Sequence, residues 1–416
     1  MGRDLSFLIP ELTLAVAAML MLVAEMLRLP RLVLGLGLAG LAAATLLTFP
    51  VLNADTSVFG GTYRIDMLSG WAKLILLPGT ALALLLARAE LAGQDREGSV
   101  YSLLCLVTLG ALMLAGGGDM MLLVLGVVLT GLGSFALVSF PRDDAATEAG
   151  MKYLVFGSVT GAVMIYGLGY KTSLVPFHFW APDAYDGAPV SVAAYLSVIT
   201  KIAGIFAFAQ ILRDLPVSSG WPMAMALIAA ATMTLGYVTA LVQTNVVRLL
   251  AYSSVAQAGY FLLAIVALGV SPLALPAIVV FGAAYVAMNL GAFGVVMVVG
   301  RHLDDFTGIG RRRPVIGLAM VVFLLSLTGI PPLFGFVGKV YLFGAAIEAG
   351  YLWLAVIAIA NSVLALGVYL RIMVPMYRPA EGPAHAAPIA PPLALTIGIA
   401  VFVTLLMGAF AGILPG

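Results

Sequence analysis

Long apolar runs recur along the whole chain, separated by short polar connections. Each run is about 20 residues long, which lets an α-helix cross roughly 30 Å of hydrocarbon while satisfying its own backbone hydrogen bonds. The alternation expected of barrel strands is absent from the sequence. The pattern predicts membrane-spanning helices near 7–27, 31–51, 66–87, 99–116, 119–140, 150–169, 188–212, 221–243, 248–269, 273–299, 313–330, 333–347, 350–374 and 390–413.

Proline interrupts the pattern of apolar runs at two places. Residues 174–183 read LVPFHFWAPD, and the segment GIPP separates 313–330 from 333–347, which we take as one broken helix. Such breaks are tolerated in a membrane only where protein or water covers the freed backbone groups. Two breaks in corresponding places of two chain halves indicate a repeated transporter with sites near the midplane, and two ordinary loops are the alternative.

The charge of the connections tests this topology. Positively charged and nearly neutral connections alternate along each half of the chain, as the positive-inside rule requires. The two halves join correctly only if one more crossing lies between 150 and 188, a segment too short for two full spans and a loop. Either about one helix has been lost where Tyr170 meets Lys171, or residues are missing there. We favour missing residues, because a lost crossing would invert everything downstream.

Composition excludes several classes of protein. Hydrophobic residues make up 62% of the chain and charged residues 9%, unlike a soluble protein, and a net charge of +1 gives no field for nucleic acid. One cysteine, Cys105, and three scattered histidines provide no disulfide, metal or haem site. Motifs of hydrolases and nucleotide-binding loops are also missing from the sequence. We therefore expect no cofactor bound by this chain.

The lysines are distributed unlike the arginines. Lys73, Lys201 and Lys339 lie inside apolar runs and Lys171 lies beside a broken one, whereas arginines sit almost entirely in connections or at span ends. A buried lysine can exchange a proton, but arginine stays charged. A charge at mid-membrane costs about 2.5–3.5 kcal/mol, so these lysines indicate function. The alternative is snorkelling to an interface, which is easier for Lys73 than for Lys201.

Few other ionisable groups accompany the lysines. Glu11 and Glu25 lie near the ends of the first run, which we read as a first helix and not as a signal peptide. His178 is a candidate proton relay or a structural hydrogen-bonding residue. Asp183, like Lys73, is a secondary candidate for proton handling, with a helix N-cap as its alternative role.

Four motifs carry a family resemblance. The stretch KTSLVPFHFWAPDAYDGAP at 171–189 resembles the signature of the antiporter-like membrane subunits of respiratory complex I. The segments LSVITK, QTNVVRLLAYSS and LTGIPPLFGFVGK, beginning at 196, 243 and 327, narrow the resemblance to subunit N of bacterial NADH:quinone oxidoreductase. The resemblance covers nearly the whole chain.

The resemblance implies an all-α polytopic membrane protein of about 14 transmembrane helices, with two inverted five-helix repeats and broken helices seven and twelve. Its function would be proton translocation coupled to quinone reduction elsewhere in the complex. Lys171, Lys201 and Lys339 match the family's relay lysines, and His178 is a possible link between them. The family's fifth-helix glutamate is Val128 here, and a usual lysine and histidine are Val247 and Gln257.

These departures keep two rivals open, a structural subunit with a degenerate proton path and a subunit of a cation/proton antiporter complex. We expect an N-terminal three-helix segment at 1–98, repeats at 99–215 and 216–375, and a C-terminal loop and helix at 376–416. The resemblance further implies complex I membrane subunits as partners and a bacterial inner membrane with both termini periplasmic. NADH, FMN, iron–sulfur clusters and quinone would be bound by other subunits.

Overall fold

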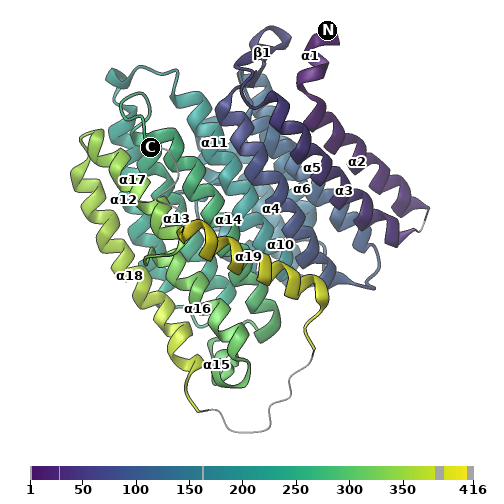
Figure 1. Cartoon of the computed structure of the whole chain (residues 1–416), viewed down its shortest axis with the longest axis vertical. Helices are drawn as coiled ribbons and strands as arrows, with labels where there is room; N and C mark the ends of the chain where they lie inside the picture. The colour runs from purple at the N-terminus through teal and green to yellow at the C-terminus, as the bar shows by residue number, and fades with distance from the viewer. Residues whose placement is uncertain (1, 28, 162–163, 380–387, 410–416) are drawn as a thin grey trace. The chain divides into compact units, whose positions relative to one another are not determined.

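The computed structural model describes residues 2–27, 29–161, 164–379 and 388–409 (Figure 1). Apart from one small hairpin, its regular structure is helical, which confirms an all-α membrane protein. Within the described ranges, 11 helices are long and apolar enough to cross a membrane. The chain forms two compact units, Met1–Ser173 with Gly187–Pro216, and Leu174–Asp186 with Val217–Gly416.

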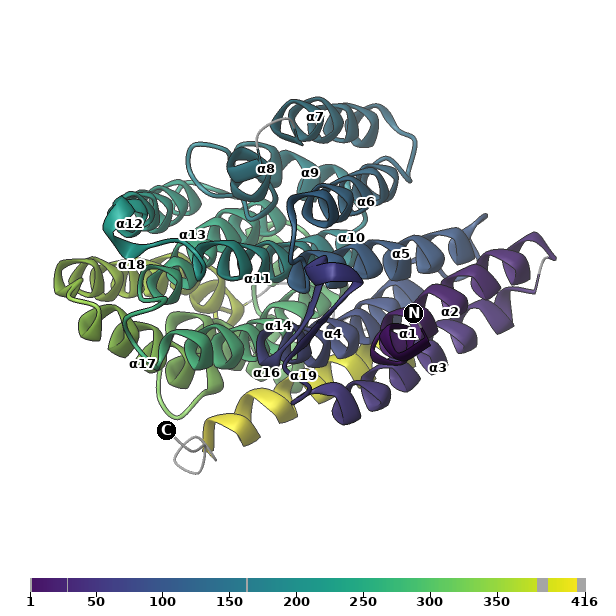
Figure 2. The ribbon, with the colours of Figure 1, turned by 90° about the horizontal axis from the view of Figure 1, so that it is seen from above.

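The first unit contains the N-terminal helices. Its α-helices are α1 (Gly2–Phe7), α2 (Ile9–Met26), α3 (Pro30–Thr48), α4 (Met67–Leu91), α5 (Glu97–Ala115), α6 (Met120–Val138), α7 (Asp144–Gly161), α8 (Met164–Lys171), α10 (Val190–Tyr195) and α11 (Lys201–Leu212). Helix α2 packs on α3 and α5, and α6 packs on α5 and α7 (Figure 2). Between α3 and α4, strands β1 (Thr56–Val58) and β2 (Tyr63–Ile65) pair antiparallel, flanked by 3₁₀ turns at Phe49–Val51 and Phe59–Gly61.

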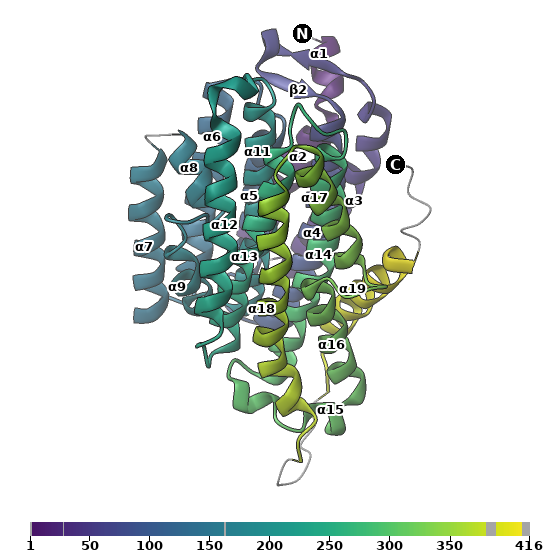
Figure 3. The same ribbon diagram turned by 90° about the vertical axis from the view of Figure 1, so that its left-hand side faces the viewer.

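The second unit is built around two deeply buried helices. It holds α9 (Trp180–Gly187, except its last residue), α12 (Trp221–Ala240), α13 (Val246–Val266), α14 (Ala274–Val299), α15 (Ile309–Arg312), α16 (Pro314–Thr328), α17 (Phe334–Glu348), α18 (Leu352–Met376) and α19 (Pro391–Ala409), with 3₁₀ turns at Val217–Ser219 and Leu303–Phe306. Helix α13 packs on α12, and α14 packs on α16, α17 and α19 (Figure 3). Helices α13 and α14 are apolar around nearly their whole circumference because protein covers them on most sides.

Both predicted helix breaks are present. Helix α16 ends at Thr328, where Gly329 takes the left-handed conformation with φ 92°, and α17 begins at Phe334. In the first break, the Val175 N–H donates to the Thr232 hydroxyl of α12 at 3.1 Å. Protein groups thus satisfy backbone that the helices leave free, as the membrane interior requires.

Two predicted spans differ from the observed helices. The single span at 150–169 is wrong, because α7 begins at Asp144 and ends at Gly161, and α8 begins at Met164 and packs against α7 and α11. The span at 188–212 is continuous but contains a π-helical turn, Leu196–Thr200, between α10 and α11.

A polar cluster fixes the start of α4 to the end of α11. The Asp66 carboxylate accepts the Ser69 N–H at 2.8 Å and pairs with Arg213 at 2.6 Å. Burial opposes ionisation, but the Ser69 N–H and Arg213 together hold the pKa of the Asp66 carboxyl below its usual 3.8. The contribution of this carboxylate to stability is therefore complete above the unfolded pKa of about 4 and is lost as pH falls through the lower, folded pKa.

We expect Asp66→Ala to lower the thermal midpoint of unfolding, since loss of a helix N-cap costs about 0.5–2 kcal/mol. Asp66→Asn keeps a capping side chain but removes the charge, so it isolates the pair with Arg213. Thermal unfolding measured across pH should show the difference between wild type and Asp66→Asn shrinking in acid. A difference that stays constant down to the lowest pH would contradict the electrostatic explanation.

Candidate functional site

Lys339 occupies a site created by the second helix break. Its buried Nζ donates to the Thr328 carbonyl at 2.9 Å and to the Ser362 hydroxyl at 3.1 Å, and lies 4.0 Å from the centre of the Tyr260 ring. Thr328 is the last residue of α16. The final carbonyls of a helix lack partners within the helix and carry the negative end of its dipole. Among the described residues, the Lys339 nitrogen is therefore held in the break by a carbonyl, a hydroxyl and a ring, with no carboxylate paired to it.

Hydroxyl and amide groups extend from Lys339 into α13. The Ser362 and Tyr260 hydroxyls are 2.9 Å apart, and the Tyr260 hydroxyl also donates to the Ala358 carbonyl. Gln257 donates to the Tyr237 hydroxyl and to the Leu327 carbonyl, both at 3.0 Å. Gln257 thus supports the end of α16, next to the carbonyl that binds Lys339.

Lys201 follows the π-helical turn as the first residue of α11. It is 1% exposed, and its Nζ has no hydrogen-bond partner among the described residues. A π turn inserts one extra residue into a helix and is frequent at functional sites. An unpaired ammonium group in an apolar interior is costly, so this position fits a nitrogen that releases and regains a proton.

Lys171 is the last residue of α8 and faces a tyrosine. Its buried Nζ donates to the Tyr153 hydroxyl at 2.7 Å and lies 5.1 Å from the centre of that ring. The Tyr170 hydroxyl donates to the Tyr153 carbonyl at 2.8 Å, which fixes Tyr153 from the other side. A phenol therefore takes the place beside Lys171 that a carboxylate could occupy.

Val128, which the resemblance matches to a glutamate of that family, provides no such carboxylate. Val128 of α6 is 46% exposed on this chain. Gly131, also on α6, is the residue whose added Cβ would lie 3.6 Å from the Lys171 Nζ. In the part of the chain that the structure describes, no salt bridge to Lys171 is present.

Asp183 and His178 lie in or beside the first break. Asp183 pairs with Arg248 at 2.9 Å, and Asp186 accepts a hydrogen bond from the Asn245 side chain at 2.8 Å. The alternative N-cap role of Asp183 is wrong, because α9 begins at Trp180 and Asp183 lies inside it. The half-buried His178 ring contacts Phe179 edge to face.

Lys73 does not snorkel to an interface. Its Nζ lies 2.7 Å from Glu11 Oε1 and 5.5 Å from the centre of the Tyr63 ring, and the side chain is buried. Glu11 had no expected role, although the sequence contains a hint of this pair. Glu11 and Lys73 each lie within two turns of the start of a helix. Because successive helices cross in alternating directions, the two helices begin on the same side of the membrane.

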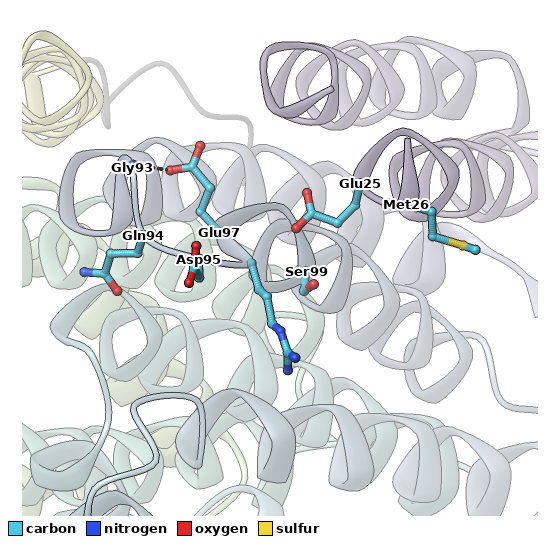
Figure 4. Close-up of a pocket in the computed structure, with 8 residues that line it drawn as sticks. Glu25, Met26, Gly93, Gln94, Asp95, Glu97 and Ser99 are labelled. Atoms are coloured by element: carbon cyan, nitrogen blue, oxygen red, sulfur yellow. Dashed lines mark hydrogen bonds between the residues drawn. The ribbon is translucent and has the colours of Figure 1, made fainter. Parts of the chain in front are cut away.

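A cleft of about 870 Å³ lies where α2 ends and α5 begins (Figure 4). Of the carboxylates that line it, Glu97 accepts hydrogen bonds from Arg88 and from the Gly93 N–H. No group of three possible metal ligands occurs among the described residues. None of the four candidate lysines lines this cleft.

Comparison with known proteins supports one family. The family model described as "NADH:quinone oxidoreductase/Mrp antiporter, TM" matches residues 158–365. NADH-quinone oxidoreductase subunit N 1 of Streptomyces griseus is 35% identical over 99% of this chain and 97% of its own length, and subunit N of Heliobacterium modesticaldum is 33% identical over 90% and 88%. A chain of Thermus thermophilus respiratory complex I with bound aureothin superposes with TM-score 0.86 at 28% identity, covering 97% of this chain and 98% of that one.

Gly329 tests how the break positions Lys339. A Cβ at Gly329 would lie 2.7 Å from the Lys339 Cδ, and its left-handed conformation costs a non-glycine residue about 1–2 kcal/mol. Gly350→Ala is the matched control, because Gly350 has φ 85° but nothing within 4 Å of an added Cβ. We expect Gly329→Ala to lower the thermal midpoint more than Gly350→Ala. Equal losses would show that the contact with Lys339 is unimportant.

Proposed function

Because the chain belongs to the family of NADH-quinone oxidoreductase subunit N, we propose that its buried lysines carry protons through it while quinone is reduced elsewhere in the complex. The observation that best supports the proposal is the Lys339 site. There a helix break supplies a carbonyl, a hydroxyl and an aromatic ring to one buried nitrogen. Arg residues, which cannot release a proton, are kept to connections and span ends.

In the second unit, Lys339 holds and passes the proton. The ammonium form is stabilised by the Thr328 carbonyl. As Nζ gives a proton to the Ser362 hydroxyl, Ser362 gives its own to the Tyr260 hydroxyl, and the phenolic proton of Tyr260 passes to a water molecule, so both hydroxyls end neutral. A chain of short hydrogen bonds of this kind polarises cooperatively in a low-dielectric interior. Gln257 stands where the family has histidine, and an amide supports this chain without taking up a proton itself.

In the first unit, Lys171 and Lys201 are the proposed relay sites. Lys171 exchanges its proton beside the Tyr153 hydroxyl, and Lys201 lies unpaired within the apolar span that contains the π turn. His178 is the proposed link near the first break. Asp183 and Lys73 remain secondary candidates, and the pairing of Asp183 with Arg248 favours a positioning role for it.

The chain is a multi-pass membrane protein, and the finer assignments are proposals. We place it in the bacterial inner membrane with both termini on the periplasmic side, beside other complex I membrane subunits. NADH, FMN, iron–sulfur clusters and quinone belong to other subunits in this proposal. Co-purification of flavin and iron–sulfur subunits with this chain would separate complex I from a cation/proton antiporter complex.

The relatives support the proposal that residues are missing near residue 170. The alignment with the Streptomyces griseus protein extends over 461 positions, whereas this chain has 416 residues, so at least 45 positions of the alignment have no residue here. That number is large enough for about one helix and a connecting loop. The 8-residue α8, which ends at Lys171, is where we place the loss.

We expect Lys201→Ala and Lys339→Ala to leave the complex assembled but to lower proton-coupled quinone reduction at least about tenfold, since a positioned proton-transfer group typically contributes about 100-fold or more. Lys152→Ala is the matched control, because Lys152 is a partly exposed lysine paired with Glu148. The measurement is proton uptake and quinone reduction in vesicles containing the whole complex.

Normal pumping in both the Lys201 and Lys339 variants would contradict the proposal. The rival of a structural subunit with a degenerate path rests on Val128 and Val247, which replace ionisable family residues. An unchanged proton yield in a Lys171→Met complex would favour that rival for the first unit.

A further inference from the structure

A pair of opposite charges is buried among the N-terminal helices of the first unit. Glu11 of α2 is 7% exposed and Lys73 of α4 is 1% exposed, and their charged atoms are 2.7 Å apart. The proposed lysine relay does not use this pair. Both residues lie near the helix ends beside the β1–β2 hairpin, with Lys73 about 9 Å along the axis from the start of α4.

The pair is poorly satisfied for a purely structural salt bridge. Glu11 Oε1 takes both the Lys73 contact and a hydrogen bond from the Tyr63 hydroxyl, while Glu11 Oε2 is buried without a partner among the described residues. Lys73 Nζ likewise has no further hydrogen-bond partner there. A buried ion pair stabilises a fold only when its remaining lone pairs and protons are satisfied. The free capacity of Oε2 and Nζ fits exchange with water or a proton.

Tyr63, in strand β2 of the hairpin, donates a hydrogen bond to Glu11. Burial, and then the charge of Glu11, raise the pKa of Tyr63 well above its usual value of 10.0, so its hydroxyl remains a donor. The ring is fixed by the end of α5, where a Cβ on Gly116 would lie 2.3 Å from the Tyr63 Cζ. The donor to Glu11 is thus held in place, while the other carboxylate oxygen, Oε2, has no hydrogen-bond partner among the described residues.

We propose that Glu11, Lys73 and Tyr63 form a proton-exchange site that is separate from the relay of Lys171, Lys201 and Lys339 and lies where α2 and α4 begin, beside the β1–β2 hairpin. In the elementary step, the proton on Lys73 Nζ moves to Glu11 Oε1, so the N–H bond breaks as an O–H bond forms. An ammonium and a carboxylate become an amine and a carboxylic acid, with no net change in charge. A water molecule hydrogen-bonded to the carboxylic acid then takes that proton as hydronium, which leaves a carboxylate and a neutral amine, and the reverse step reloads Lys73. Asp66 is the other charged group that acts on Tyr63.

Infrared difference spectroscopy on the intact complex, recorded between two pH values, tests the proposal. We expect a carbonyl band of a protonated carboxylic acid that shifts in Glu11→Asp and is lost in Glu11→Gln/Lys73→Met. The double variant removes both charges together, so it leaves no unpaired buried ion. Its proton yield per quinone reduced should also fall. Thr80→Val is the control. Thr80 lies in α4, as Lys73 does, and the change breaks a neutral buried contact with Thr108 of α5.

An assembled double variant with unchanged proton yield, or a spectrum without a Glu11-dependent band, would overturn the proposal and leave a structural ion pair. If the double variant does not assemble, the same carbonyl band is measured in Glu11→Asp and in Tyr63→Phe, which retain both charges. A band that is unshifted in both variants would equally overturn the proposal. The result is independent of the relay, because normal pumping by the Lys201 and Lys339 variants would leave the Glu11 band in place.

Discussion

The cost of an unpaired charge in an apolar interior governs this protein. Backbone groups freed at a helix break and ammonium groups buried between helices are both unfavourable there, and each can satisfy the other. At Lys339 they do so directly, because the last carbonyl of α16 accepts a hydrogen bond from the lysine. The broken helix is therefore as much a part of the site as the lysine.

The buried lysines meet this constraint in different ways. Lys339 has a carbonyl, a hydroxyl and a ring, Lys171 has a tyrosine hydroxyl and ring, and Lys201 has no hydrogen-bond partner in the described part of the chain. Lys73 alone of these has a carboxylate, Glu11. A set of nitrogens held with such different strength suits stepwise proton movement, since a proton passes between sites only when neither binds it too firmly.

The features that could be predicted from the sequence are those set by the residues of a single helix. Hydrophobic run length located the spans, GIPP located the second break, and the confinement of arginine to connections singled out the lysines. Contacts between helices were not predictable in this way. The partner of Lys73 lies 62 positions away in Glu11, and the partner of Asp183 lies 65 positions away in Arg248. The separate helix α8, which packs against α7, was missed because the run 150–169 is apolar almost throughout.

We propose that a helix end and hydroxyl groups, with no carboxylate among the described residues, hold and pass the proton of Lys339. The proton yield per quinone reduced by a complex carrying Ser362→Ala tests it most directly, because this change removes the hydroxyl between Lys339 and Tyr260 and leaves every charge in place. We expect an assembled complex with a reduced proton yield. An unchanged yield would show that protons do not leave Lys339 through this hydroxyl.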